Sequence, residues 1–153
     1  MKRSHLRTQA WLLRGISSIP GALRLAGGRL SFTAFGAGNL WPSQLRTLER
    51  DTGRIGLAKR LGKEENTVVF DVPLADIQHV RFPWYYFSGG LKLTLNGIVY
   101  RFGFDRPSNT KLSGEGADLV GEVSRARRSG KAWKAVLIDA SSASSTGLFL
   151  VFL

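Results

Sequence analysis

Few residues in this chain of 153 could support catalysis or metal binding. Cysteine is absent, which excludes disulfides, thiolate metal sites and cysteine nucleophiles together. His79 could act as a general base, but no serine and carboxylate lie near it at a spacing that would orient it. A single histidine among scattered carboxylates makes no metal site. We therefore expect no catalytic residue, no metal and no cofactor.

Two glycine-containing segments have only a superficial likeness to phosphate-binding loops. Gly36-Ala-Gly38 has no third glycine in register, and the segment before it is expected to be an antiparallel hairpin instead of the start of a βαβ unit. In residues 56–64 the glycine spacing is one residue too long, and Glu64 stands where a phosphate loop needs Ser or Thr. The sequence therefore favours a binding module over an enzyme.

Positive charge is the strongest compositional feature of the chain. Lysine and arginine number 22 against 11 acidic residues, which gives a formal net charge of +11. Residues 1–48 hold seven of the bases and no acid, so most of the excess lies in the first third of the sequence. A one-sided field of this kind favours anionic partners, such as acidic lipids, nucleic acid or acidic proteins.

Basic residues on predicted strands are the first candidates for an anion-binding site. They are expected on the outer face of the fold: Arg24, Arg29, Arg81, Lys92 and Arg101. Since strand residues are held in place, these side chains could form one patch for an anionic headgroup. Whether they converge depends on strand register, which the sequence leaves open.

An aromatic run supplies the second candidate contact. Phe82-Pro-Trp-Tyr-Tyr-Phe87 lies just before Ser88-Gly-Gly90, next to an expected turn. If they are exposed, four of its rings could insert at a bilayer interface, meet a protein partner, or stack on bases: Trp84, Tyr85, Tyr86 and Phe87. The alternative is that several of these rings close one end of the core.

Strands must position most of these side chains. Six segments have the alternation or the β-branched composition of strands: 22–26, 29–35, 67–72, 77–82, 91–95 and 98–104. Gly27-Gly28 and Asn96-Gly97 are turn signals that join the first two and the last two into hairpins. The inward residues of the hairpins are expected to be Leu23, Leu25, Leu30, Phe32, Leu91, Leu93, Leu95, Ile98, Tyr100, Phe102 and Phe104.

A helix is predicted over residues 115–137. Its apolar stripe recurs at helical spacing and comprises Leu119, Val123, Ala126, Gly130, Trp133 and Leu137. Acidic residues lie toward its start and basic residues toward its end, which matches the helix dipole. We expect Trp133 to anchor this helix on a sheet or on the mouth of a barrel.

The expected organisation is a single domain with extensions at both ends. Its parts are a basic N-terminal extension at 1–19, a domain at 20–137 with a loop insertion at 36–66, and a Ser-rich spacer with an apolar tail at 138–153. The insertion is expected to hold a short helix within 44–61, on the loose recurrence of Leu45, Leu48, Ile55 and Leu57. The tail at 147–153 is too short to span a bilayer, but it could dock in a groove, add an edge strand or promote self-association.

Several segments resemble PH-like domains, in particular GRAM and bacterial PH-like domains. Residues 20–32, which end in Arg29-Leu-Ser-Phe32, are similar to the opening in which a strand turns into an R-L-x-F strand. Phe70-Asp-Val-Pro-Leu-Ala-Asp-Ile77 resembles the f-x-i-P-L-x-d-I segment of these families, and Val80 fits the valine that commonly follows. Gly90-Leu-Lys-Leu-Thr-Leu95 with Tyr100-Arg-Phe102 is similar to their later hairpin.

The resemblance covers most of the chain and implies a mainly β (α+β) fold. This fold is an antiparallel β-barrel of about seven strands capped by a C-terminal α-helix, and it usually serves as a non-catalytic scaffold. We expect it to bind anionic membrane lipid headgroups or a protein or peptide partner through its basic face. Nucleic-acid binding is the alternative, although no RNP, OB or helix-turn-helix signature supports it.

The sequence also predicts where the protein acts. No apolar run approaches the length of about 20 residues that a spanning helix needs, so no transmembrane span is expected. Without a signal peptide or disulfides, the expected location is the cytoplasm, with a peripheral position at the membrane. The sequence leaves the oligomeric state open.

Overall fold

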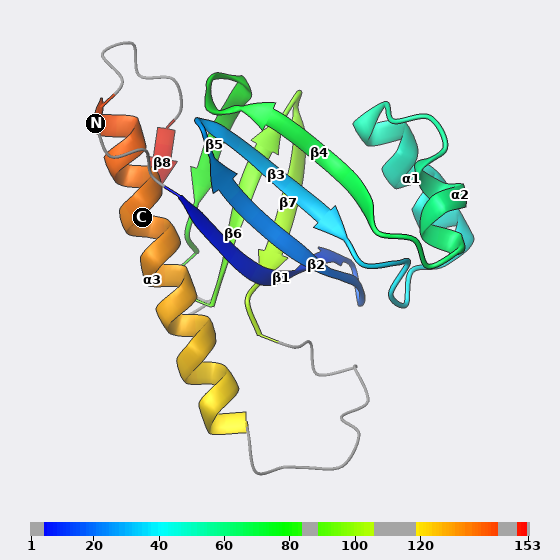
Figure 1. The fold of residues 1–153 in the computed structure, drawn as a ribbon, viewed down its shortest axis with the longest axis horizontal. Coiled ribbons are helices and arrows are strands. Elements are labelled where there is room, and N and C mark those ends of the chain that lie inside the picture. Colours follow the sequence, from blue (N-terminus) through cyan, green and yellow to red (C-terminus); the bar gives the residue numbers. More distant parts are fainter. Residues whose placement is uncertain (1–4, 84–88, 106–118, 144–149, 153) are drawn as a thin grey trace.

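A curled sheet forms the body of the molecule in a computed structural model that describes residues 5–83, 89–105, 119–143 and 150–152 (Figure 1). The strand order is β4-β3-β2-β1-β7-β6-β5-β8. The strands are β1 Leu6–Arg14, β2 Ser17–Ala26, β3 Arg29–Ala34, β4 Thr67–Pro73, β5 Ile77–Arg81, β6 Gly90–Leu95, β7 Ile98–Gly103 and β8 Leu150–Phe152. The first seven are antiparallel to their neighbours and make a half-barrel, so the mainly β expectation is confirmed.

Residues 6–14 form the central strand β1, although residues 1–19 were expected to be an extension outside the domain. β1 pairs with β2 along its whole length and, near its end, with β7. Ala10 and Leu12 are fully buried, whereas Arg7 is exposed on the opposite face. The sheet therefore begins well before residue 20, the expected start of the domain. The strand was not predicted because Trp11 and Leu13, which are half-buried on its outward face, are apolar too, so apolar and polar residues do not alternate along it.

Both predicted hairpins are confirmed. β2 and β3 turn at Gly27-Gly28, and β6 and β7 turn at Asn96-Gly97, with positive φ at all four turn residues. Turns of this kind match the twist of the flanking strands, so they set the register of both hairpins. All of the predicted inward residues are buried except Ile98, which is half-buried.

Aromatic rings fill the concave side of the sheet. Phe32 lies 4.9 Å from Phe102 between ring centroids, and Phe70 lies 5.5 Å from Tyr100. Helix α3, Leu119–Ala143, packs against β1 and β6 (Figure 1). Of its predicted stripe, Ala126, Gly130, Trp133 and Leu137 are buried, and the other two side chains lie outside the described ones. None of the helices described here is long and apolar enough to cross a membrane.

Residues 138–143 and 150–152 belong to elements of the fold. Helix α3 extends through residue 143, so the first residues of the expected spacer are helical. β8 pairs in parallel with β5, from His79↔Leu150 to Arg81↔Phe152. An added edge strand was one of the three expectations for the apolar tail, and the structure contains it.

The insertion between β3 and β4 is folded, with two helices where one was expected within a loop. Helix α1 spans Pro42–Thr52 and α2 spans Leu57–Gly62. Their inner residues join the core of the sheet and are buried: Leu45, Leu48, Leu57 and Leu61. Ile55, which was expected on this apolar side, lies between the helices and is exposed. The chain leaves the sheet at Ala34 and returns at its cross-strand partner Thr67.

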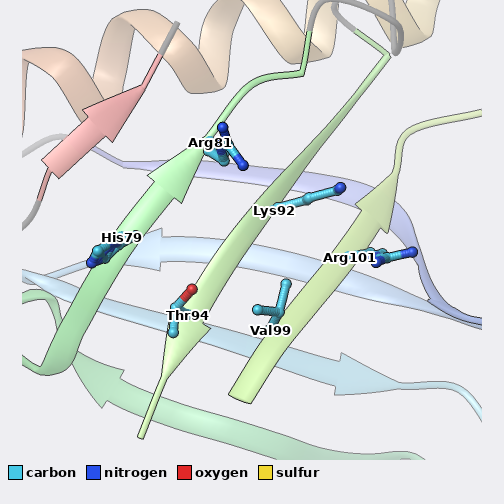
Figure 2. A pocket seen from close by; sticks show the side chains of 6 residues that line it. All are labelled: His79, Arg81, Lys92, Thr94, Val99 and Arg101. Atoms are coloured by element: carbon cyan, nitrogen blue, oxygen red, sulfur yellow. The ribbon is translucent and has the colours of Figure 1, made fainter. Parts of the chain in front are cut away.

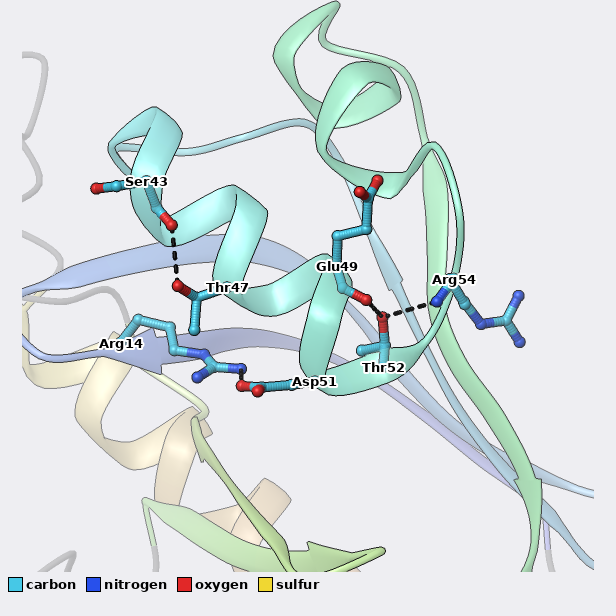
Figure 3. Close-up of polar contacts among 7 residues, drawn as sticks. All are labelled: Arg14, Ser43, Thr47, Glu49, Asp51, Thr52 and Arg54. Carbon is cyan, nitrogen blue, oxygen red and sulfur yellow. Dashed lines mark hydrogen bonds and ion pairs between the residues drawn. The ribbon is translucent and has the colours of Figure 1, made fainter.

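Polar contacts hold α1 on the end of β1 (Figure 3). Arg14 Nη2 donates to Asp51 Oδ2 at 3.0 Å, and the guanidinium carbon lies 5.8 Å from the centroid of the Tyr100 ring. The loop before α1 also comes close to β2, since Ser18 N donates to Asn39 Oδ1 at 2.7 Å. Gly38 allows this approach, because a Cβ there would overlap the Ser18 carbonyl oxygen.

The buried phenol of Tyr100 gives the fold a predictable weakness at alkaline pH. Burial raises its pKa above the ordinary 10.0, while Arg14 opposes this shift and Asp51 adds to it. The unfolded chain therefore releases the phenol proton first. The stability that depends on neutral Tyr100 is fully present below pH 10 and is lost as pH rises through the higher pKa of the folded state.

We expect Tyr100→Phe to lose less stability than the wild type between about pH 9 and 11. Melting curves across this range provide the measurement, with the difference in melting temperature between the two proteins followed against pH. A difference that stays constant would contradict this role of the phenol.

Candidate functional site

A pocket of about 490 Å³ opens on the outer face of β5, β6 and β7 (Figure 2). The residues that line it are His79, Arg81, Lys92, Thr94, Val99 and Arg101. They form two rows, each of which crosses all three strands. Arg81, Lys92 and Arg101 are cross-strand partners in the first row, and the other three are partners in the second.

This arrangement follows from the alternation of side chains along the strands. Leu91 and Leu93 on β6, and Tyr100 and Phe102 on β7, are buried on the concave side. The residues between them must therefore point outward. Direct cross-strand neighbours lie about 5 Å apart, so each cationic group can share a ligand with the one on the next strand.

A bulge in β5 turns both His79 and Arg81 to the outer face of the sheet. Ile77 pairs with Leu95 and His79 pairs with Thr94, so Gln78 is one residue in excess on β5. Its side-chain oxygen accepts a hydrogen bond from Gly97 N at 2.7 Å. Because the bulge shifts the alternation by one residue, Val80 is buried while both of its neighbours are exposed.

The pocket is electrostatically one-sided. Two guanidinium groups, one ammonium group, an imidazole and the Thr94 hydroxyl line it, and none of the lining residues that the structure describes is a carboxylate. Figure 2 shows Lys92 and Arg101 extending in the same direction from neighbouring strands. Guanidinium groups hold oxyanions through paired hydrogen bonds, while an ammonium group acts as a compact point charge. The pocket therefore has the chemistry to bind an anion with several oxygen atoms.

Three of the five basic residues predicted for the site lie together, and the other two lie elsewhere. Arg24 is opposite Arg7 of β1, six positions from Leu13, which is the partner of Arg101. At the rise of an extended strand this separation is about 20 Å. Arg29 is held at the far side of the sheet, where its Nε donates to Asp71 Oδ1 at 3.0 Å. The sheet order therefore excludes one patch formed by all five.

Three lining residues were not among the predicted site residues. Thr94 and Val99 were within reach of the sequence, because a two-residue turn at Asn96-Gly97 places them opposite each other. The sequence indicates only that His79 lies on a strand. Its place in the pocket depends on the bulge at Gln78, which no local sequence pattern predicts. The predicted aromatic contact at residues 84–87 lies outside the described residues.

The rest of the described chain offers weaker candidates. A smaller hollow of about 270 Å³ is lined by Arg14, Gly15, Ser43, Gln44 and Thr47. Arg14 is the one basic residue among these, against three in the larger pocket, so this hollow is less suited to an anion. No cluster of three potential metal ligands occurs among the residues that the structure describes. No protein-family model, no curated protein and no solved structure matches this chain.

Proposed function

We propose that this chain is a PH-like, non-catalytic binding module that recognises anionic membrane lipids. The β5–β7 pocket holds the phosphate of the lipid headgroup. The observation that carries this proposal is the row of Arg81, Lys92 and Arg101, with no carboxylate among the described residues that line the pocket. Three cations on neighbouring strands surround one phosphate with less loss of side-chain freedom than cations on a mobile tail.

The size of the pocket supports a headgroup as the ligand. Sites for small ligands occupy about 300–1,000 Å³, and this one lies in that range at about 490 Å³. An extended nucleic-acid strand needs a longer basic track that follows its backbone. Arg24 and Arg29 do not prolong the row, because both lie toward the opposite edge of the sheet. These two features favour a compact anion.

The order of elements supports the PH-like part of the proposal. Seven antiparallel strands precede a helix that packs on the sheet, which agrees with the order expected from the resemblance. The segments that carry the resemblance lie in strands of the sheet or at a strand end. Arg29-Leu-Ser-Phe32 lies in β3, Pro73 ends β4 before the short 3₁₀ turn Leu74–Asp76, and Gly90–Leu95 forms β6.

Co-sedimentation of the full chain with vesicles tests the proposal. Phosphatidylcholine vesicles are compared with vesicles that also carry phosphatidylserine or a phosphoinositide, at about 0.15 M and 0.5 M salt. We expect binding only to the anionic vesicles, weaker at the higher salt, and competition by a soluble inositol phosphate. Equal binding to neutral vesicles would overturn the proposal, and so would competition by RNA or an acidic peptide but not by the inositol phosphate.

A further inference from the structure

Ile55 is the most exposed large hydrophobic residue in the described ranges, with 93% of its surface accessible. It lies in residues 53–56, which join α1 to α2. Backbone hydrogen bonds hold this loop at both ends: Gly53 N donates to Glu49 O at 2.9 Å, and Leu57 N donates to Arg54 O at 3.2 Å. The isoleucine is therefore presented to solvent by an ordered turn.

The two acidic residues of the insertion helices both have a partner, one on β1 and one within the insertion. Asp51 accepts from Arg14, and Glu49 Oε1 accepts from the backbone N–H of Ala58 at 3.1 Å. They are the only acids in residues 42–63. The bases of the same range are exposed, except for the half-buried Arg54: Arg46, Arg50, Lys59, Arg60 and Lys63. The outer surface of the two helices is consequently basic.

Two cations lie near the turn that holds the exposed isoleucine. Arg54 precedes it, and its side chain points away from α1 (Figure 3). Arg60 lies close to Gly56, the residue after Ile55, since its Nη1 is 3.8 Å from the position that a Cβ on Gly56 would take. We define the insertion tip as Arg54, Ile55 and Arg60. The helices next to the insertion tip are packed on the core, because Leu48 of α1 and Leu57 of α2 are fully buried.

We infer that the insertion tip is a second contact with an anionic bilayer. Ile55 enters the boundary between headgroups and acyl chains, and Arg54 and Arg60 bind the lipid phosphates around it. An apolar side chain near cations is the pattern of an interfacial anchor, in which apolar burial and attraction to anionic lipid act together. A nucleic acid would draw on the two arginines and leave the isoleucine without a role. This inference rests on the proposed function for the choice of a membrane, but it uses none of the pocket residues.

The absence of cysteine allows a direct test of insertion. Ile55→Cys, labelled with an environment-sensitive dye, is mixed with vesicles of phosphatidylcholine containing about 30% phosphatidylserine. The matched control is Ile16→Cys, because Ile16 is 86% exposed in the turn between β1 and β2. We expect a blue shift from the dye at position 55 and none at position 16. Equal shifts at both positions, or no shift at position 55, would overturn the inference.

A binding measurement separates the tip from the pocket. Ile55→Ser is expected to bind these vesicles about tenfold more weakly than the wild type, and Ile16→Ser to bind them equally well. Titration with soluble inositol phosphate reports on the pocket and is expected to be the same for all three proteins. If Ile55→Ser binds vesicles like the wild type, the tip inference is wrong. If only the soluble titration fails, the pocket proposal is wrong while the tip inference stands.

Discussion

Arg81→Glu combined with Arg101→Glu is expected to abolish binding to anionic vesicles. Both side chains line the pocket on either side of Lys92, and the double variant changes the local charge by four units. At about 1 kcal/mol for each basic charge near an anionic surface, the affinity should fall on the order of a thousandfold. Both residues are exposed, so the melting temperature is expected to change little. Vesicle co-sedimentation and a melting curve on the same samples make the comparison.

The sheet itself provides a matched control for this variant. Arg7→Glu combined with Arg24→Glu makes the same change in net charge on two exposed cross-strand partners, far from the pocket. We expect this control to lose much less affinity, through the general field alone. Similar losses in the two double variants would show that net charge, and not the pocket, governs binding.

Trp133→Ala is expected to have the largest effect on stability. Trp133 is fully buried and anchors α3 against the sheet. Truncation of a buried tryptophan costs about 3–5 kcal/mol, a large share of the stability of a domain of this size. Trp41→Ala deletes the same side chain where it is 68% exposed, and there we expect a loss of about 0.5 kcal/mol or less. Urea unfolding followed by circular dichroism measures both.

A third variant separates two contributions of Trp133 to stability, the packing of its ring and the burial of its polar N–H group. The indole Nε1 is buried and has no hydrogen-bond partner among the described residues. Trp133→Phe keeps most of the ring packing and removes this unpaired donor, so it is expected to cost much less than Trp133→Ala. Equal losses in the alanine and phenylalanine variants would contradict the role of ring packing. Equal stability of Trp133→Ala and Trp41→Ala would contradict the anchoring of α3.

The features that could be predicted from the sequence are those determined over short distances. Gly27-Gly28 and Asn96-Gly97 impose tight turns, and a tight turn sets which residues of a hairpin face the core. The stripe that contains Trp133 needed only the helical period. β1 was not predicted, because its own residue pattern does not mark it as a strand. Only its pairing with β2 and β7 in the folded sheet does so. Only one of the two helices of the insertion was predicted, because glycines and charged residues interrupt the helical pattern. The stability of these helices comes from the packing of Leu48 and Leu57 in the core.

The same distinction explains the candidate site. Lys92 and Arg101 belong to one hairpin, so their pairing follows from its turn. Arg81 joins them because β5 is the next strand of the sheet and carries a bulge at Gln78, which depends on tertiary pairing. Arg24 was assigned to the same site only because it was expected on the same outer face. Its true distance depends on β1 lying between β2 and β7, which no local signal determines.

The insertion is joined to the sheet in a way that makes it exchangeable. It begins after Ala34 and ends before Thr67, and these residues are neighbours across two antiparallel strands. A segment whose ends already meet can be shortened, lengthened or replaced at little entropic cost, without moving either strand. What a replacement must supply is the apolar cover that Leu45 and Leu48 provide over the core. The two helices can therefore be transferred as a unit. Grafting them between equivalent strands of another half-barrel would transfer the insertion tip without the β5–β7 pocket.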